Sequence, residues 1–143
     1  MNNSSTVCVD ASLVIRLVIS EADPFHAQWG TWIEQNVRFV APTLLYYEVV
    51  NGLYQYEKAQ ILPTESVNKA LAAALTFPIE LFGEPWLHQQ AKALAKKFTL
   101  PAVYDAHYLA LSEQMDIDLW TADARLYKAL QPFGVTWVKL VGA

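Results

Sequence analysis

The sequence predicts an α/β fold with a mostly parallel sheet. Short apolar and β-branched segments alternate along the chain with longer segments in which apolar residues recur at helical spacing. The chain has no repeats, low-complexity tracts or linkers, and 143 residues is a usual length for one domain. We therefore expect a single domain over residues 1–143. Because crossovers between parallel strands are right-handed, helices should cover both faces of an open sheet.

Five segments are predicted as strands. The first, TVCVD at 6–10, is short and almost entirely apolar, as expected for a strand buried on both faces. The second, RFVAP at 38–42, ends at Pro42, which has no backbone N–H for a sheet. The remaining strands are predicted at 78–83, 117–120 and 135–140.

Seven segments with helical spacing separate these strands. They span 11–19, 22–36, 43–60, 64–75, 84–98, 102–115 and 121–130. Pro24 is placed where a first helical turn tolerates proline. Thr43 and Thr64 are the residue type preferred as N-caps, so we expect each of them to cap the helix that follows.

Composition and charge limit the classes of function. Hydrophobic residues make up 54% of the chain and charged residues 17%, which predicts an apolar surface covered by a partner. The net charge of −4 argues against a general DNA binder. The first residues, MNNSSTV, lack a basic stretch followed by an apolar one, and no apolar run can span a bilayer. We expect a cytoplasmic protein with no membrane segment, in which Cys8 is a buried, reduced thiol.

Two acids are predicted to meet at one edge of the sheet. Asp10 closes the first strand, and Asp123 follows the fourth strand by three residues. Parallel sheets bind ligands at the carboxyl ends of their strands, so both carboxylates should lie at that edge. Asp118 is a rival for the fourth acid, but it begins its strand and should lie at the opposite edge.

Glu48 and Asp105 also have apolar neighbours, each on a helix. Taken alone, any of these acids is more often a cap, a partner of the helix dipole, or a residue at a helix seam. Four such acids without bases would repel one another and resist ionisation. A hard cation such as Mg²⁺ or Mn²⁺ removes that conflict, since it prefers carboxylate oxygens and water. Without these four, the remaining ten acids balance the ten bases.

Four segments resemble the acidic motifs of the PIN domain family. They are VDAS after the first strand, YEVVNGL, AVYDAHYLALSE and LWTADARL. Their order and spacing, over about residues 6–140, are similar to those of VapC-like ribonuclease toxins. The resemblance implies a three-layer α/β/α sandwich with a parallel sheet of about five strands and an acidic pocket at its carboxyl edge.

The resemblance also implies roles for individual residues. Asp10 and Asp105 match the principal metal ligands, while Glu48 and Asp123 match the acids that complete the site or orient water. Three neutral residues match supporting positions in the motifs: Ser12, Asn51 and Thr121. The cofactor implied is Mg²⁺, with Mn²⁺ as an alternative.

The implied function is metal-dependent hydrolysis of RNA by the toxin of a toxin–antitoxin pair. The implied partners are RNA, a second copy of the chain and a small antitoxin. The alternative is a PIN protein that acts in RNA processing, or that binds RNA or protein without cutting. Phosphotransfer receivers and Asp-x-Asp phosphatases fit less well, because VDAS has neither adjacent acids nor a second aspartate.

Other side chains have two interpretations each. Arg16 and Arg125 follow Asp10 and Asp123 and are either phosphate contacts or surface charges. His107 is expected at the surface rather than among the ligands. Aromatic residues on two helices are predicted either to fill the core or to form a dimer interface: Tyr46, Tyr47, Tyr54, Tyr56, Trp29 and Trp32.

Overall fold

The computed structural model describes residues 5–142, and its centre is a parallel sheet of five strands. The strands are β1 (Thr6–Val9), β2 (Arg38–Pro42), β3 (Ile79–Phe82), β4 (Asp118–Thr121) and β5 (Val138–Leu140). Their order is β3-β2-β1-β4-β5, and all neighbouring pairs are parallel. The predicted α/β class is confirmed. Because β1 lies between β2 and β4, the residues that follow these strands meet at the middle of one sheet edge.

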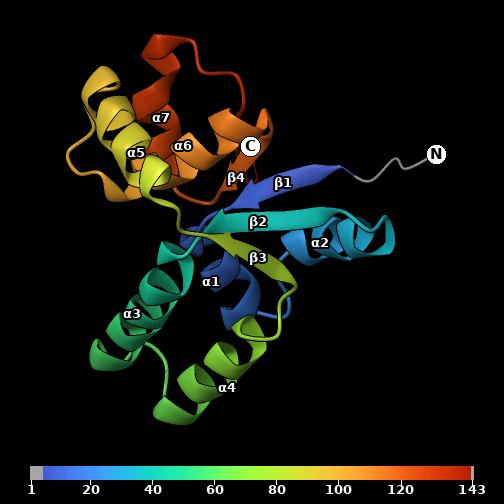
Figure 1. The fold of residues 1–143 in the computed structure, drawn as a ribbon. Helices are drawn as coiled ribbons and strands as arrows, with labels where there is room; N and C mark the ends of the chain where they lie inside the picture. The colour runs from blue at the N-terminus through green and yellow to red at the C-terminus, as the bar shows by residue number, and fades with distance from the viewer. Residues whose placement is uncertain (1–4, 143) are drawn as a thin grey trace.

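Seven α-helices connect the strands within residues 5–142. They are α1 (Ala11–Ile19), α2 (Phe25–Glu34), α3 (Leu44–Lys58), α4 (Thr64–Ala74), α5 (Pro85–Lys97), α6 (Tyr104–Met115) and α7 (Ala124–Leu130). Helices α5, α6 and α7 lie on one side of the sheet, and α1 to α4 lie on the other (Figure 1). This is the three-layer sandwich that the sequence predicts. No helix in the described part of the chain combines the length and apolar character needed to cross a membrane.

Several helix ends differ from the predictions. Thr43 occupies the N-cap position of α3, but its backbone is helical and its side chain makes no capping hydrogen bond, while its N–H donates to the Phe82 carbonyl at 2.9 Å. Pro63, not Thr64, is the N-cap of α4. Pro24 precedes α2 as its N-cap instead of lying in the first turn. A short 3₁₀ helix at Gln131–Phe133 follows α7 without having been predicted.

The two tryptophans of α2 belong to the core. Trp29 stacks on Phe39 of β2 with ring centroids 4.3 Å apart, and Trp32 meets Trp120 of β4 at 5.1 Å. Both α2 rings are buried. The interpretation that places them in a dimer interface is therefore wrong. Their spacing of three residues puts both on the helix face that packs against the sheet.

Cys8 is buried completely, as predicted. Its thiol faces α6 and contacts the Tyr108 carbonyl at 3.9 Å. Burial raises the pKa of this thiol to about 12, so Cys8 is an unreactive core residue.

Candidate active site

Asp10 is held by three hydrogen bonds at the end of β1. Its Oδ1 accepts from the Leu13 N–H at 3.1 Å and from the Ser12 hydroxyl at 2.6 Å. Its Oδ2 accepts from the Thr121 hydroxyl. Asp10 is the N-cap of α1, and only 5% of its surface is exposed. Capping of α1 accounts only for the bond from the Leu13 N–H. The bonds from the Ser12 and Thr121 hydroxyls fix the direction of the carboxylate.

Ser12 and Thr121 also connect β1 to the loop after β4. The Ser12 Oγ accepts from the Ala122 N–H at 2.9 Å, and the Thr121 Oγ1 accepts from the Asp123 N–H at 3.0 Å. Each hydroxyl thus donates to Asp10 and accepts from the backbone of the loop. This pattern places the loop carrying Asp123 beside Asp10.

Asp123 is at the carboxyl edge and Asp118 is not. Asp123 is the N-cap of α7, and its Oδ1 accepts from the N–H groups of Arg125 and Leu126 at 2.9 and 3.3 Å. Asp118 is the first residue of β4 and pairs with Val7, at the other end of the strand from Thr121. The position predicted for each of these two acids is therefore the one observed.

Glu48 extends from α3 toward α6. Its Oε1 accepts a hydrogen bond of 2.6 Å from the hydroxyl of Tyr108, a side chain only 1% exposed. Gly52, one turn further along α3, allows α1 to approach closely, because a Cβ there would lie 2.5 Å from the Ile15 Cδ1. Asn51 has a different partner, since its Oδ1 accepts from Gln55 at 3.4 Å.

Tyr108 is a site residue that the sequence analysis missed. It follows Asp105 by three residues, so both lie on the same face of α6. That spacing was visible in the sequence. Its bond to Glu48 was not, because the two residues are 60 positions apart.

Asp105 is the acid that links the other three electrostatically. The pKa of Asp10 is raised to about 6, mainly by burial and also by the Asp105 charge, against the effect of its hydrogen bonds. The pKa of Glu48 is also raised, first by burial and then by Asp105, while the Tyr108 bond opposes the shift. For Asp105 itself, burial and the Asp123 charge raise the pKa and Arg125 lowers it. Asp10, Glu48 and Asp123 therefore each lie within electrostatic range of Asp105.

These carboxylates have the chemistry of a magnesium site but do not form a closed cage. Among residues 5–142, no three His, Cys, Asp or Glu side chains are gathered closely enough to hold a metal ion directly. Mg²⁺ keeps several water ligands and is usually bound through one or two carboxylates and substrate phosphates. The ion pairs within this range, Arg16–Asp23 and Arg38–Glu80, use none of the four acids. Hard oxygen donors without a basic partner fit Mg²⁺ or Mn²⁺.

The two arginines near the site differ in their availability. The Arg16 Nε is paired with the Asp23 carboxylate at 2.7 Å, which directs the guanidinium to the loop before α2. Arg125 has no such ion pair within the described residues, and its charge lowers the pKa of Asp105. Of the two candidate phosphate contacts, Arg125 is the one beside the acids.

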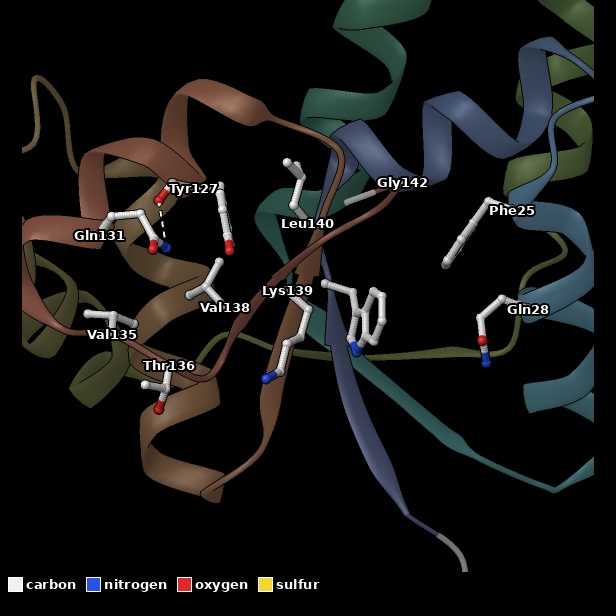
Figure 2. Close-up of a pocket in the computed structure, with 11 residues that line it drawn as sticks. Phe25, Gln28, Tyr127, Gln131, Val135, Thr136, Val138, Lys139, Leu140 and Gly142 are labelled. Carbon is white, nitrogen blue, oxygen red and sulfur yellow. Dashed lines mark hydrogen bonds between the residues drawn. The ribbon is translucent and has the colours of Figure 1, made fainter.

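A cavity of about 560 Å³ lies elsewhere, along the edge strand β5. Figure 2 shows Tyr127 of α7 and Gln131 of the following 3₁₀ helix on one side of β5, and Phe25 and Gln28 of α2 on the other. None of the four acids lines it. The acidic region and this cavity are separate features.

Comparison with known proteins identifies the family. The family model described as the PIN domain matches residues 7–130. A solved structure of PAE2754 from Pyrobaculum aerophilum has a TM-score of 0.64 and 22% identity, covering 87% of this chain and 84% of that one. The Mycobacterium tuberculosis VapC20, described as a Sarcin-Ricin loop cleaving toxin, has a TM-score of 0.60 and 16% identity, covering 86% and 94%. No curated protein sequence matches. Since the family model covers most of the chain, this protein belongs to the PIN domain family.

Proposed function

We propose that the chain is a metal-dependent endoribonuclease and the toxin of a toxin–antitoxin pair. PIN domains are generally nucleases, and one structural neighbour is a VapC toxin. The observation that carries the proposal is the set of carboxylates around Asp105: its charge raises the pKa of Asp10 and Glu48, the Asp123 charge raises its own pKa, and none of the four acids has an ion-pair partner among the described residues. We propose further that residues 1–143 act as one domain, in the cytoplasm.

Each acid has a role that follows from its surroundings. Asp10 and Asp105 would hold Mg²⁺ or Mn²⁺, since Asp10 is fixed in direction and Asp105 is central to the group. Glu48, aligned by Tyr108, and Asp123 would orient the attacking water. When bound, the metal ion lowers the pKa of a coordinated water and neutralises charge on the phosphate. Ser12 and Thr121 act through Asp10, and Asn51 completes the predicted set as an outer polar residue.

The alternative is a PIN protein that acts in RNA processing, or one that binds RNA or protein without cutting. A complete set of four acids favours cleavage over binding alone. The nature of the neighbouring gene distinguishes a toxin from a processing enzyme, because a toxin is encoded beside a short antitoxin reading frame.

Removal of the metal is expected to abolish cleavage. Purified protein should cleave a mixed pool of single-stranded RNA in Mg²⁺, lose that activity in excess EDTA and regain it when Mn²⁺ is added, because the water is activated only beside the ion. The assay is a denaturing gel. Cleavage that persists in EDTA contradicts metal dependence, and no cleavage with either ion supports the non-cleaving alternative.

Asp123→Asn and Asp118→Asn should separate the two candidates for the fourth acid. Asn is as good an N-cap as Asp, so Asp123→Asn removes the charge at α7 while keeping the fold. We expect it to lower kcat by about 10–100-fold, as for loss of a residue that orients a metal ligand or water. Asp118→Asn, at the far end of β4, should leave kcat unchanged. Equal losses in both variants would contradict the assignment of Asp123.

The proposed homodimer interface is an apolar groove on α3, α4 and β3. It is lined by Thr43, Tyr46, Tyr47, Val50, Leu71, Leu75 and Leu81. Tyr47 is 75% exposed and Leu75 59%, whereas the Tyr46 hydroxyl donates to the Ala74 carbonyl at 2.9 Å. Exposed apolar side chains that adjoin one another are typical of an interface. The antitoxin is proposed to cover the acidic region instead.

Light scattering tests the groove. Wild type should be a dimer at micromolar concentration, and Leu75→Glu should be a monomer, because a charge in an apolar interface has no partner. Ile61→Glu is the matched control, since Ile61 is 64% exposed but lies outside the groove. A monomeric wild type would contradict the proposed dimer, and a dimer that tolerates Leu75→Glu would place its contact elsewhere.

A further inference from the structure

A second, smaller cavity lies at the carboxyl edge of the sheet. Its volume is about 300 Å³, and it begins where β2 ends, at Pro42. Tyr47 of α3 and Tyr104 of α6 line it, and each directly precedes an acid in the sequence, Glu48 and Asp105. The cavity is therefore formed by the same two helices that bring these acids to the site.

The two tyrosines present planar rings to solvent. Tyr47 is 75% exposed and Tyr104 is 58% exposed. Three of the other six residues that line this cavity are apolar: Pro42, Leu44 and Leu87. Flat aromatic rings over an apolar floor are the surface on which unpaired nucleobases stack.

Two histidines form a fixed wall of the same cavity. The His107 Nδ1 lies 2.8 Å from the Val103 carbonyl, which can only accept, so this nitrogen carries a proton. In the neutral ring, Nε2 is then an acceptor, and the His88 Nδ1–H donates to it at 2.9 Å. Neutral His88 is thereby left with Nε2 as a hydrogen-bond acceptor. The hydrogen bond between the two histidines connects α5 to α6 in the absence of any ligand.

We infer that this cavity holds a nucleobase of the single-stranded RNA next to the phosphate that is cut. The base stacks on Tyr104, and the Nε2 of His88 accepts from an amino group on its edge. The inference rests on the proposed nuclease function and names where its substrate is held. RNA is the occupant because the cavity lies where β2 ends, at the carboxyl edge of the sheet, and two of its lining residues directly precede Glu48 and Asp105.

The test is binding of a random-sequence RNA oligonucleotide that contains 2-aminopurine. All proteins carry Asp10→Asn so that the RNA stays intact, and Mg²⁺ is present. Tyr104→Ala should raise the Kd by about tenfold and reduce the quenching of 2-aminopurine, because a stacked base is lost. Tyr104→Phe keeps the ring and should restore both. Tyr54→Ala is the control, since Tyr54 is 55% exposed on α3 but does not line the cavity.

Two results would overturn the inference. One is an unchanged Kd in Tyr104→Ala, and the other is a changed mass by light scattering, which would assign Tyr104 to a protein contact. The experiment distinguishes failure of the nucleobase subsite from failure of the proposed nuclease function. Binding that depends on Tyr104 in a protein that never cleaves RNA supports the subsite and refutes the nuclease. Cleavage by wild type with a KM that Tyr104→Ala does not change refutes the subsite and supports the nuclease.

Discussion

Asp10→Asn is expected to abolish RNA cleavage in Mg²⁺ or Mn²⁺ while leaving the fold intact. Asn keeps the size of the side chain and the oxygen that accepts from Leu13 and Ser12, but it removes the charge that would hold the cation. Loss of a residue that only orients a ligand costs about 10–100-fold, so loss of a ligand itself should exceed 100-fold. The measurement is single-turnover cleavage on gels, beside a thermal melt of both proteins.

The same substitution should make the metal-free protein more stable at neutral pH. The pKa of Asp10 is raised to about 6, so the folded state holds this proton more tightly than the unfolded state. The contribution of Asp10 to stability is therefore greatest below its ordinary pKa. This contribution, about 3 kcal/mol in the free energy of unfolding, is lost as the pH rises from 3.8 to about 6. Asp10→Asn has no such loss.

Melts in EDTA at pH 4 and pH 7 measure the difference. The drop in Tm between the two pH values should be smaller in the variant than in wild type. A variant that fails to fold would make Asp10 a structural cap. A variant that cleaves RNA at the wild-type rate would refute the proposed mechanism.

Asp105→Asn should remove activity and also change the titration of its neighbours. Its charge raises the pKa of both Asp10 and Glu48, so its removal should lower both pKa values. Cleavage should fall by more than about 100-fold, as for Asp10. Carboxyl carbon NMR of the metal-free protein follows the two neighbours directly.

Asp116→Asn is the matched control for Asp105. Asp116 follows the opposite end of α6 with φ of 55°, a conformation that Asn adopts as readily as Asp. This variant should keep both the activity and the pKa values of the acids. An Asp10 pKa that does not respond to Asp105→Asn would show that the two carboxylates are too far apart to share an ion.

The position of the acids at one edge was predictable because it follows from local rules. Asp10 ends a strand and Asp123 follows one, and parallel strands deliver such residues to the same side. The same rule excluded Asp118 from the site, because Asp118 begins its strand instead of following it. What makes Asp123 a neighbour of Asp10 is the pairing of β1 with β4, and the alternating pattern favoured that pairing without fixing it.

Contacts between distant segments were not predictable. The bond from Tyr108 to Glu48 depends on how α3 and α6 cross, and no local pattern in either helix encodes that geometry. The tryptophans of α2 illustrate the same limit, since an apolar helix face predicts burial without saying whether the sheet or a partner covers it. Thr43 holds the N-cap position that the sequence predicts, but its side chain does not cap α3, because its backbone is helical instead of extended.

The central place of β1 has a consequence for synthesis of the protein. The Asp10 carboxylate is fixed by Thr121, 111 residues later in the chain, and β1 pairs with β4 through Val7 and Asp118. Chains grow at about 5–20 residues per second, so β1 waits several seconds on the ribosome before its second neighbour exists. A nascent chain that ends before β4 has Asp10, Glu48 and Asp105, but it lacks Asp123 and the Thr121 hydroxyl that donates to Asp10. Most of this polypeptide is therefore synthesised before the group of four acids is complete.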